Sequence, residues 1–131
     1  MTRINASIPP AKLSNKHLLS EAREIKRIPN CIKSGRYDMK GQPNKFTLGT
    51  GHVKFFYDKL LYLYNRYQAI HTECLKREFN VTDYSDAWDG LSSFPHLWND
   101  WEETLEAKIL ISERINLRLG LSGDVNDWRE C

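Results

Sequence analysis

The segment His17-Leu18-Leu19-Ser20-Glu21-Ala22-Arg23-Glu24-Ile25-Lys26-Arg27 has the pattern of an amphipathic helix. Its apolar residues recur at helical spacing and form one stripe, which predicts a face directed at a core. They are Leu18, Leu19, Ala22 and Ile25. Ser14 is suited to cap the first turn, and Leu13 can pack on Leu18 as a hydrophobic staple. Pro29 is expected to end or kink this helix near Arg27.

A cluster of charge lies on another flank of the same predicted helix. Arg27 comes three residues after Glu24 and four after Arg23, and residues at these spacings are neighbours on a helix surface. We expect a carboxylate held between two guanidinium groups, which would keep Glu24 ionised and could also bind phosphates. On spacing alone, an ordinary salt-bridged solvent face is the simpler interpretation of this cluster.

Two more helices are predicted downstream, over residues 52–78 and 98–119. The first carries apolar residues at helical spacing: Phe56, Leu60, Leu63, Tyr67, Ile70 and Cys74. The second carries a similar face: Trp98, Trp101, Leu105, Ile109, Ser112, Ile115 and Leu119. We expect Asn80 to cap the first helix, Gly120 to stop the second and Trp128 to anchor the tail. With long loops at 30–50 and 81–97 and no strand pattern, the sequence predicts an all-α fold, a compact three-helix single domain over residues 1–131.

The size and composition suit one intracellular domain. A chain of 131 residues can bury a core, and no apolar run approaches the roughly 18 residues of a membrane helix. No signal segment opens the chain, so we expect a cytoplasmic protein. Three cysteines without paired spacing favour a reducing compartment. His71 and Cys74 form a lone His-x-x-Cys pair, whereas a zinc site needs four ligands, so no metal is expected.

Charge is distributed unevenly along the chain. Residues 1–54 contain eleven Lys and Arg against three Asp and Glu, whereas residues 55–131 contain eight against fourteen. The first part therefore carries a net charge of +8 and the second a net charge of −6. Such asymmetry is typical of a protein that turns one face toward a polyanion, although an excess of lysines on solvated loops would give the same count.

The segment Gly49-Thr50-Gly51-His52 resembles part of a nucleotide-binding loop, but it lacks the preceding strand and the third glycine. We interpret it as a tight entry into the helix predicted over residues 52–78. His52 is then expected to be a structural residue that forms hydrogen bonds at the start of that helix.

The beginning of the chain suggests nucleophilic chemistry. Thr2 is small enough for methionine aminopeptidase to remove Met1, which would leave Thr2 with a free α-amine. The pKa of an α-amine is about 7.7–8.0, below the lysine value of about 10.4, so more of it is neutral and able to attack a sugar C1′. Arg3 would lower that pKa further by like-charge repulsion. Glu24 could stabilise positive charge that develops on a ribose, or move a proton.

Several blocks carry a more specific signal when they are taken together. They are Thr2-Arg3-Ile4-Asn5, His17-Leu18, Arg23-Glu24, Arg27, Gly49 to Leu60, and Glu73-Cys74-Leu75-Lys76-Arg77. In this order and near this spacing they resemble the pyrimidine-dimer DNA glycosylases of phages and algal viruses, and they cover most of residues 1–80. Two positions depart from that family: Ala22 stands where it usually has tyrosine, and Lys26 where it usually has proline.

The resemblance implies a monomeric, compact three-helix protein that acts on damaged double-stranded DNA, away from membranes, without metal or cofactor. The cell would be a bacterium or the host of a virus. The resemblance also implies that the Thr2 amine attacks C1′ of the 5′ nucleotide of a cyclobutane pyrimidine dimer and forms an imine, and that β-elimination then cuts the strand. Glu24 matches the family's catalytic glutamate. The expected DNA-binding residues are Arg3, His17, Arg23, Arg27 and Lys33.

Other functions are compatible with the same residues. A related glycosylase and lyase could act on another damaged or modified base. A DNA-binding module without catalysis could use the same basic half of the chain, and a small scaffold could carry that charge incidentally.

Overall fold

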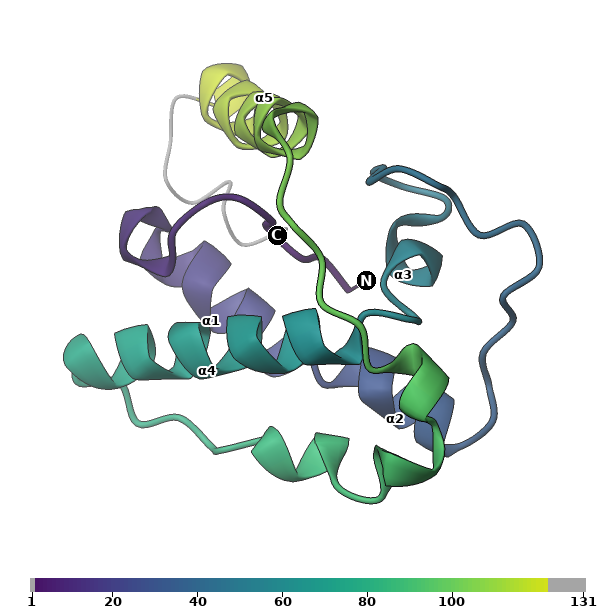
Figure 1. Cartoon of the computed structure of the whole chain (residues 1–131). Coiled ribbons are helices and arrows are strands. Elements are labelled where there is room, and N and C mark those ends of the chain that lie inside the picture. The colour runs from purple at the N-terminus through teal and green to yellow at the C-terminus, as the bar shows by residue number, and fades with distance from the viewer. Residues whose placement is uncertain (1, 123–131) are drawn as a thin grey trace.

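The computed structural model describes the backbone of residues 2–122 and the side chains as far as Ile115 (Figure 1). Within that part, the chain forms helices and short 3₁₀ turns, and its one β-bridge is isolated, between Lys59 and Trp98. The α-helices are α1 (Asn15–Glu24), α2 (Arg27–Lys33), α3 (His52–Phe55), α4 (Leu60–Lys76) and α5 (Leu105–Ser122). The 3₁₀ turns are η1 (Pro10–Lys12), η2 (Ser85–Trp88), η3 (Leu91–Ser93) and η4 (Pro95–Leu97). The all-α prediction is confirmed, but the described chain has five α-helices rather than three.

Helix α1 begins as its sequence predicts. The Oγ of Ser14 accepts the backbone N–H of His17 at 3.1 Å, and Leu13 and Leu18 are buried in one cluster. The helix ends at Glu24, and the chain becomes helical again in α2, which begins at Arg27. Pro29 lies in the first turn of α2, where its missing N–H has no helical partner to lose. Glu24 and Arg27 therefore belong to different helices.

The helix predicted over residues 52–78 is interrupted after Phe55. The side chain of Gln42 donates to the carbonyls of Lys54 and Phe55, at 3.2 Å each, and the Nζ of Lys59 donates to the Phe55 carbonyl at 2.9 Å. The N–H groups of Tyr57 and Lys59 bond three residues back, to the carbonyls of Lys54 and Phe56, and the α-helical pattern restarts in α4. Gln42 belongs to a loop that is distant in sequence, so the periodicity of the predicted helix gives no indication of its contacts at this break.

The predicted cap at Asn80 is wrong. Helix α4 ends at Lys76, and Glu78 takes the left-handed conformation with a φ of 61°. The N–H of Phe79 then donates to the Cys74 carbonyl at 3.0 Å, as in a Schellman motif. The turn closes two residues earlier than predicted because Phe79 packs into the cluster that contains Leu13 and Leu18.

The helix predicted over residues 98–119 begins later and lasts longer. Thr104 caps α5 by accepting the N–H of Ala107 at 3.1 Å, and the helix continues through Gly120 to Ser122. Among its side chains as far as Ile115, Ala107 and Ile111 are buried, whereas Leu105 and Ile109 of the predicted face are 72% and 47% exposed. Trp128 lies outside the described residues.

The core surrounds α4, against which α1 packs. The segment after Thr2 runs between α5 and the layer of α1 and α4, and Ile4 and Ala6 in it are completely buried (Figure 1). Among the described helices, none has the length and apolar character needed to cross a membrane.

Candidate active site

His52 fixes the backbone of the N-terminal segment. Its Nε2 accepts the backbone N–H of Ile4 at 2.9 Å, and its Nδ1 lies 2.8 Å from the carbonyl oxygen of Thr47. Burial lowers the pKa of His52 from 6.5 to about 4, so the ring is neutral near pH 7. A neutral ring that accepts at Nε2 carries its proton on Nδ1 and donates it to Thr47. The structural role predicted for His52 is confirmed.

A buried ion pair holds the next residue of the segment. The Nε of Arg66 donates to Oε2 of Glu21 at 2.7 Å, and the two side chains are 6% and 0% exposed. The Nδ2 of Asn5 donates to Oε1 of Glu21 at 3.0 Å, and the Asn5 carbonyl accepts from Arg66 at 2.9 Å. Helices α1 and α4 together therefore clamp the chain three residues after Thr2.

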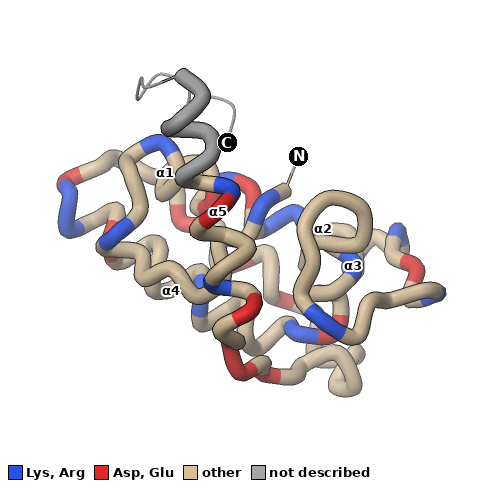
Figure 2. The backbone as a smooth tube through the Cα atoms, turned by 90° about the horizontal axis from the view of Figure 1, so that it is seen from above, with Lys and Arg blue, Asp and Glu red and all other residues tan. Residues whose placement is uncertain are grey.

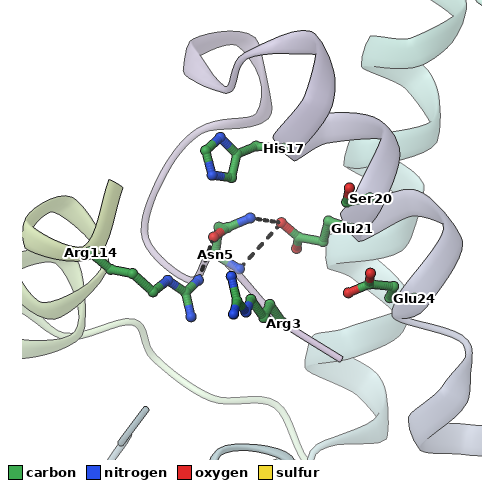
Figure 3. A pocket seen from close by; sticks show the side chains of 7 residues that line it. All are labelled: Arg3, Asn5, His17, Ser20, Glu21, Glu24 and Arg114. Atoms are coloured by element: carbon green, nitrogen blue, oxygen red, sulfur yellow. Dashed lines mark hydrogen bonds between the residues drawn. The ribbon is translucent and has the colours of Figure 1, made fainter. Parts of the chain in front are cut away.

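Glu24 lies in a narrow pocket between α1, the N-terminal segment and α5 (Figure 3). The pocket is lined by Arg3, Asn5, His17, Ser20, Glu21, Glu24 and Arg114. Glu24 is 7% exposed, and its buried Oε1 has no hydrogen-bond partner among the described residues. The same is true of Nη1 of Arg3. Most buried polar atoms are paired, so an unpaired carboxylate oxygen and an unpaired guanidinium nitrogen in one pocket suggest a site for a ligand.

Thr2 lies in a second, larger pocket of about 330 Å³. This pocket is lined by Thr2, Arg3, Gly49, Gly51, His52, Val53, Lys54, Tyr57 and Arg114. Arg3 and Arg114 line both pockets, so the space beside Thr2 adjoins the space beside Glu24. Thr2 itself is 9% exposed. The two residues that the sequence selects for chemistry therefore line two pockets that share Arg3 and Arg114.

The predicted DNA-binding residues separate into two groups. Arg3 and His17 line the Glu24 pocket, and His17 is buried, with its Nδ1 3.0 Å from the Oγ of Ser14. Arg23, Arg27 and Lys33 are exposed and line neither pocket.

The predicted salt bridges of Glu24 are wrong. No ion pair within 4 Å joins Glu24 to Arg23 or Arg27 in the described part of the chain. The reason is the break after α1, which places Arg27 on another helix, while Arg23 points to solvent and lines a separate pocket of about 260 Å³.

Sequence reasoning missed three residues of the site, Glu21, Arg66 and Arg114. Arg66 had a usable signal, because it lies beside Tyr67 on the buried arc of its helix and a charge there requires a buried partner. Arg114 had none. Its Nη2 donates to Oδ1 of Asn5 at 2.7 Å across 109 residues of sequence, a contact that only the packing of α5 creates.

The polar groups of the site suit an anionic substrate. Seen from above, Lys and Arg positions lie beside the N-terminal end of the chain, at the side of α5 (Figure 2). Within the described residues, no group of three or more His, Cys, Asp and Glu is placed to hold a metal ion. Where Met1 is removed, the site also contains the terminal amine of Thr2.

The chain matches a known protein family. A family model described as pyrimidine dimer DNA glycosylase matches residues 1–86 of the 131 in this chain. The matched part contains Thr2, Glu24 and the Gly49–Gly51 turn, whereas Arg114 and the rest of α5 lie beyond it.

Proposed function

The chain belongs to the pyrimidine dimer DNA glycosylase family, its substrate is therefore DNA, and on that premise we propose a mechanism for its action. The α-amine of Thr2, freed by removal of Met1, attacks C1′ of the 5′ nucleotide of a cyclobutane pyrimidine dimer. The glycosidic bond breaks as an imine forms, and β-elimination then cuts the strand. Glu24 is the catalytic carboxylate, which stabilises positive charge on the sugar or moves a proton.

One observation carries this proposal: the unpaired Oε1 of Glu24 lies in a pocket that adjoins Thr2 across Arg3 and Arg114. Leaving a buried carboxylate oxygen without a hydrogen bond costs about 1–3 kcal/mol or more. Such a cost is understandable in a residue whose partner arrives with the substrate. Arg3 and Arg114 line the same pocket as this carboxylate, so two cations are close to the acid that the proposal requires.

The surroundings of Thr2 also favour a reactive amine. Arg3 and Arg114 line the pocket that contains Thr2, so an amine at Thr2 would lie among cations. The hydrogen bond from Ile4 to His52 limits the movement of the chain two residues after Thr2. A nucleophile held in position in this way needs less ordering at the moment of attack.

The exposed cations complete the proposal. We assign Arg23, Arg27 and Lys33 to the DNA backbone, where contacts with phosphates set register and orientation. Arg3 and His17 would reach the reacting nucleotide itself. Entry of the damaged strand requires local unstacking, which costs a few kcal/mol and costs least where damage has already weakened the stack.

Borohydride trapping tests the mechanism. Purified protein, irradiated duplex DNA and borohydride should yield a covalent protein–DNA adduct, because reduction converts the imine into a stable amine. Glu24→Gln should bind the same DNA and form little adduct, whereas Glu106→Gln on the exposed surface of α5 should behave as the parent protein. Normal cleavage by Glu24→Gln would contradict the assignment of Glu24. Salt-sensitive binding with no adduct from the parent protein would instead favour a non-catalytic DNA-binding module.

A further inference from the structure

Lys54 lies in the same pocket as Thr2, and the mechanism above gives it no role. It belongs to the short helix α3, which starts directly after Gly51. Its Nζ donates to the carbonyl of Lys40 at 2.7 Å, which fixes the direction of the side chain. An ammonium has three protons, so this hydrogen bond leaves two for another acceptor.

The lining of the pocket defines what that acceptor can be. Three cationic residues line it, Arg3, Lys54 and Arg114, and among the described residues no Asp or Glu does. His52 contributes no charge near pH 7. An anion with several acceptor oxygens suits such a lining, and a phosphate of the DNA strand that reacts at Thr2 would be the nearest source.

Resting on the proposed function, we propose that Lys54 binds the 3′ phosphate of the reacting nucleotide and stabilises it as the leaving group of strand cleavage. In that step the imine joins the Thr2 nitrogen to C1′. A proton leaves C2′ for a base, and its electron pair forms a carbon–carbon double bond. The C3′–O3′ bond then breaks, and its electron pair leaves on the phosphate oxygen. Water finally hydrolyses the conjugated imine and returns the Thr2 amine.

The proposal separates two rates that otherwise change together. Formation of the imine places no new charge on the phosphate, whereas elimination does, and a positioned cation lowers the energy of the second step alone. Loss of Lys54 should therefore slow strand cleavage more than imine formation. One charge-assisted hydrogen bond corresponds to on the order of tenfold in rate.

The test uses the full chain and duplex DNA with a single abasic site, so that base removal is not required. Borohydride trapping measures the imine, and a denaturing gel measures cleavage. Lys54→Met should trap as the parent protein does and cleave on the order of tenfold more slowly. Lys54→Arg should restore cleavage. Lys76→Met, which removes an exposed lysine at the far end of α4, should match the parent protein in both measurements.

A second neutral variant controls for loss of folding in Lys54→Met. Lys54→Gln can still donate to the Lys40 carbonyl, so it should keep the thermal midpoint of the parent protein and show the same selective loss of cleavage. Equal loss of trapping and cleavage in both neutral variants, with normal midpoints, would overturn the proposal. So would unchanged cleavage. A parent protein that never traps on abasic DNA would instead overturn the proposed function.

Substrates with one neutral methylphosphonate distinguish the two phosphates of the nucleotide. With the 5′ phosphate neutralised, the parent protein should still cleave faster than Lys54→Met by the same factor. With the 3′ phosphate neutralised, that factor should fall to one. The reverse result would assign Lys54 to the 5′ phosphate and overturn its role in the leaving group.

Discussion

The imidazole of His52 accepts the backbone N–H of Ile4 at 2.9 Å and so joins the first turn of α3 to the chain two residues after Thr2. The pKa of His52 is about 4 in the folded protein and 6.5 in its ordinary state. Its contribution to the free energy of unfolding is therefore complete above pH 6.5 and is lost as the pH falls through about 4. The loss across that window should be about 3 kcal/mol.

Urea unfolding between pH 7 and pH 4 measures this contribution. The free energy of unfolding of His52→Gln should depend less on pH than that of the parent protein, because the variant has no proton to gain at this position. His96→Gln, which changes an exposed histidine, should leave the pH dependence unaltered. Identical pH profiles for His52→Gln and the parent protein would contradict the role given to His52.

The buried pair of Arg66 and Glu21 predicts a large loss of stability. Arg66→Met would leave the Glu21 carboxylate buried without its cation, and breaking such a pair costs about 3–5 kcal/mol. Lys45→Met breaks a pair whose side chains are 82% and 75% exposed, and it should change the free energy of unfolding little. Chemical denaturation of the two variants compares them directly. Equal effects would mean that the buried pair does not clamp Asn5 to α1 and α4.

The sequence predicted correctly those features that depend on residues within a single helix. The cap at Ser14 and the apolar stripe on α1 are of this kind, and both are confirmed. The spacing of Trp98 and Trp101 also fits a helix, yet other contacts determine their positions. Trp101 stacks on Phe46 with ring centroids 5.9 Å apart, and the indole N–H of Trp98 donates to the Leu91 carbonyl at 2.9 Å. Packing between distant segments therefore overrides periodicity there.

The same distinction applies to the candidate site. Thr2, Arg3 and Glu24 were selected from the sequence because residue type and motif carried information about each of them. The hydrogen bond between Asn5 and Arg114 was not predicted, because helical spacing gives no information about contacts between residues far apart in sequence. The predicted contact between Glu24 and Arg27 failed because it assumed that one helix continued through residues 25 and 26.

Because Arg27 is an exposed cation, its removal should change how DNA affinity depends on salt concentration. If Arg27 contacts one phosphate, Arg27→Ala should weaken binding to damaged and undamaged duplexes alike. It should also reduce the slope of log affinity against log salt by about 0.9. Titrations at several salt concentrations measure this slope, and Lys76→Ala at the far end of α4 serves as the matched control. A slope that stays unchanged in Arg27→Ala would remove Arg27 from the DNA interface.

The last prediction concerns the nitrogen of Thr2. If this nitrogen is the nucleophile, its side chain is dispensable and its primary amine is not. Thr2→Ala permits removal of Met1 and keeps the amine, so it should still form the borohydride-trapped adduct. A chain with one uncleaved residue before Thr2 has an amide in place of the amine, and an amide nitrogen is not nucleophilic, so trapping should disappear while DNA binding persists. Intact mass confirms the first residue of each preparation. Trapping by the extended chain would transfer the chemistry to another amine, either the α-amine of the added residue or the Nζ of Lys54, which belongs to the same pocket as Thr2.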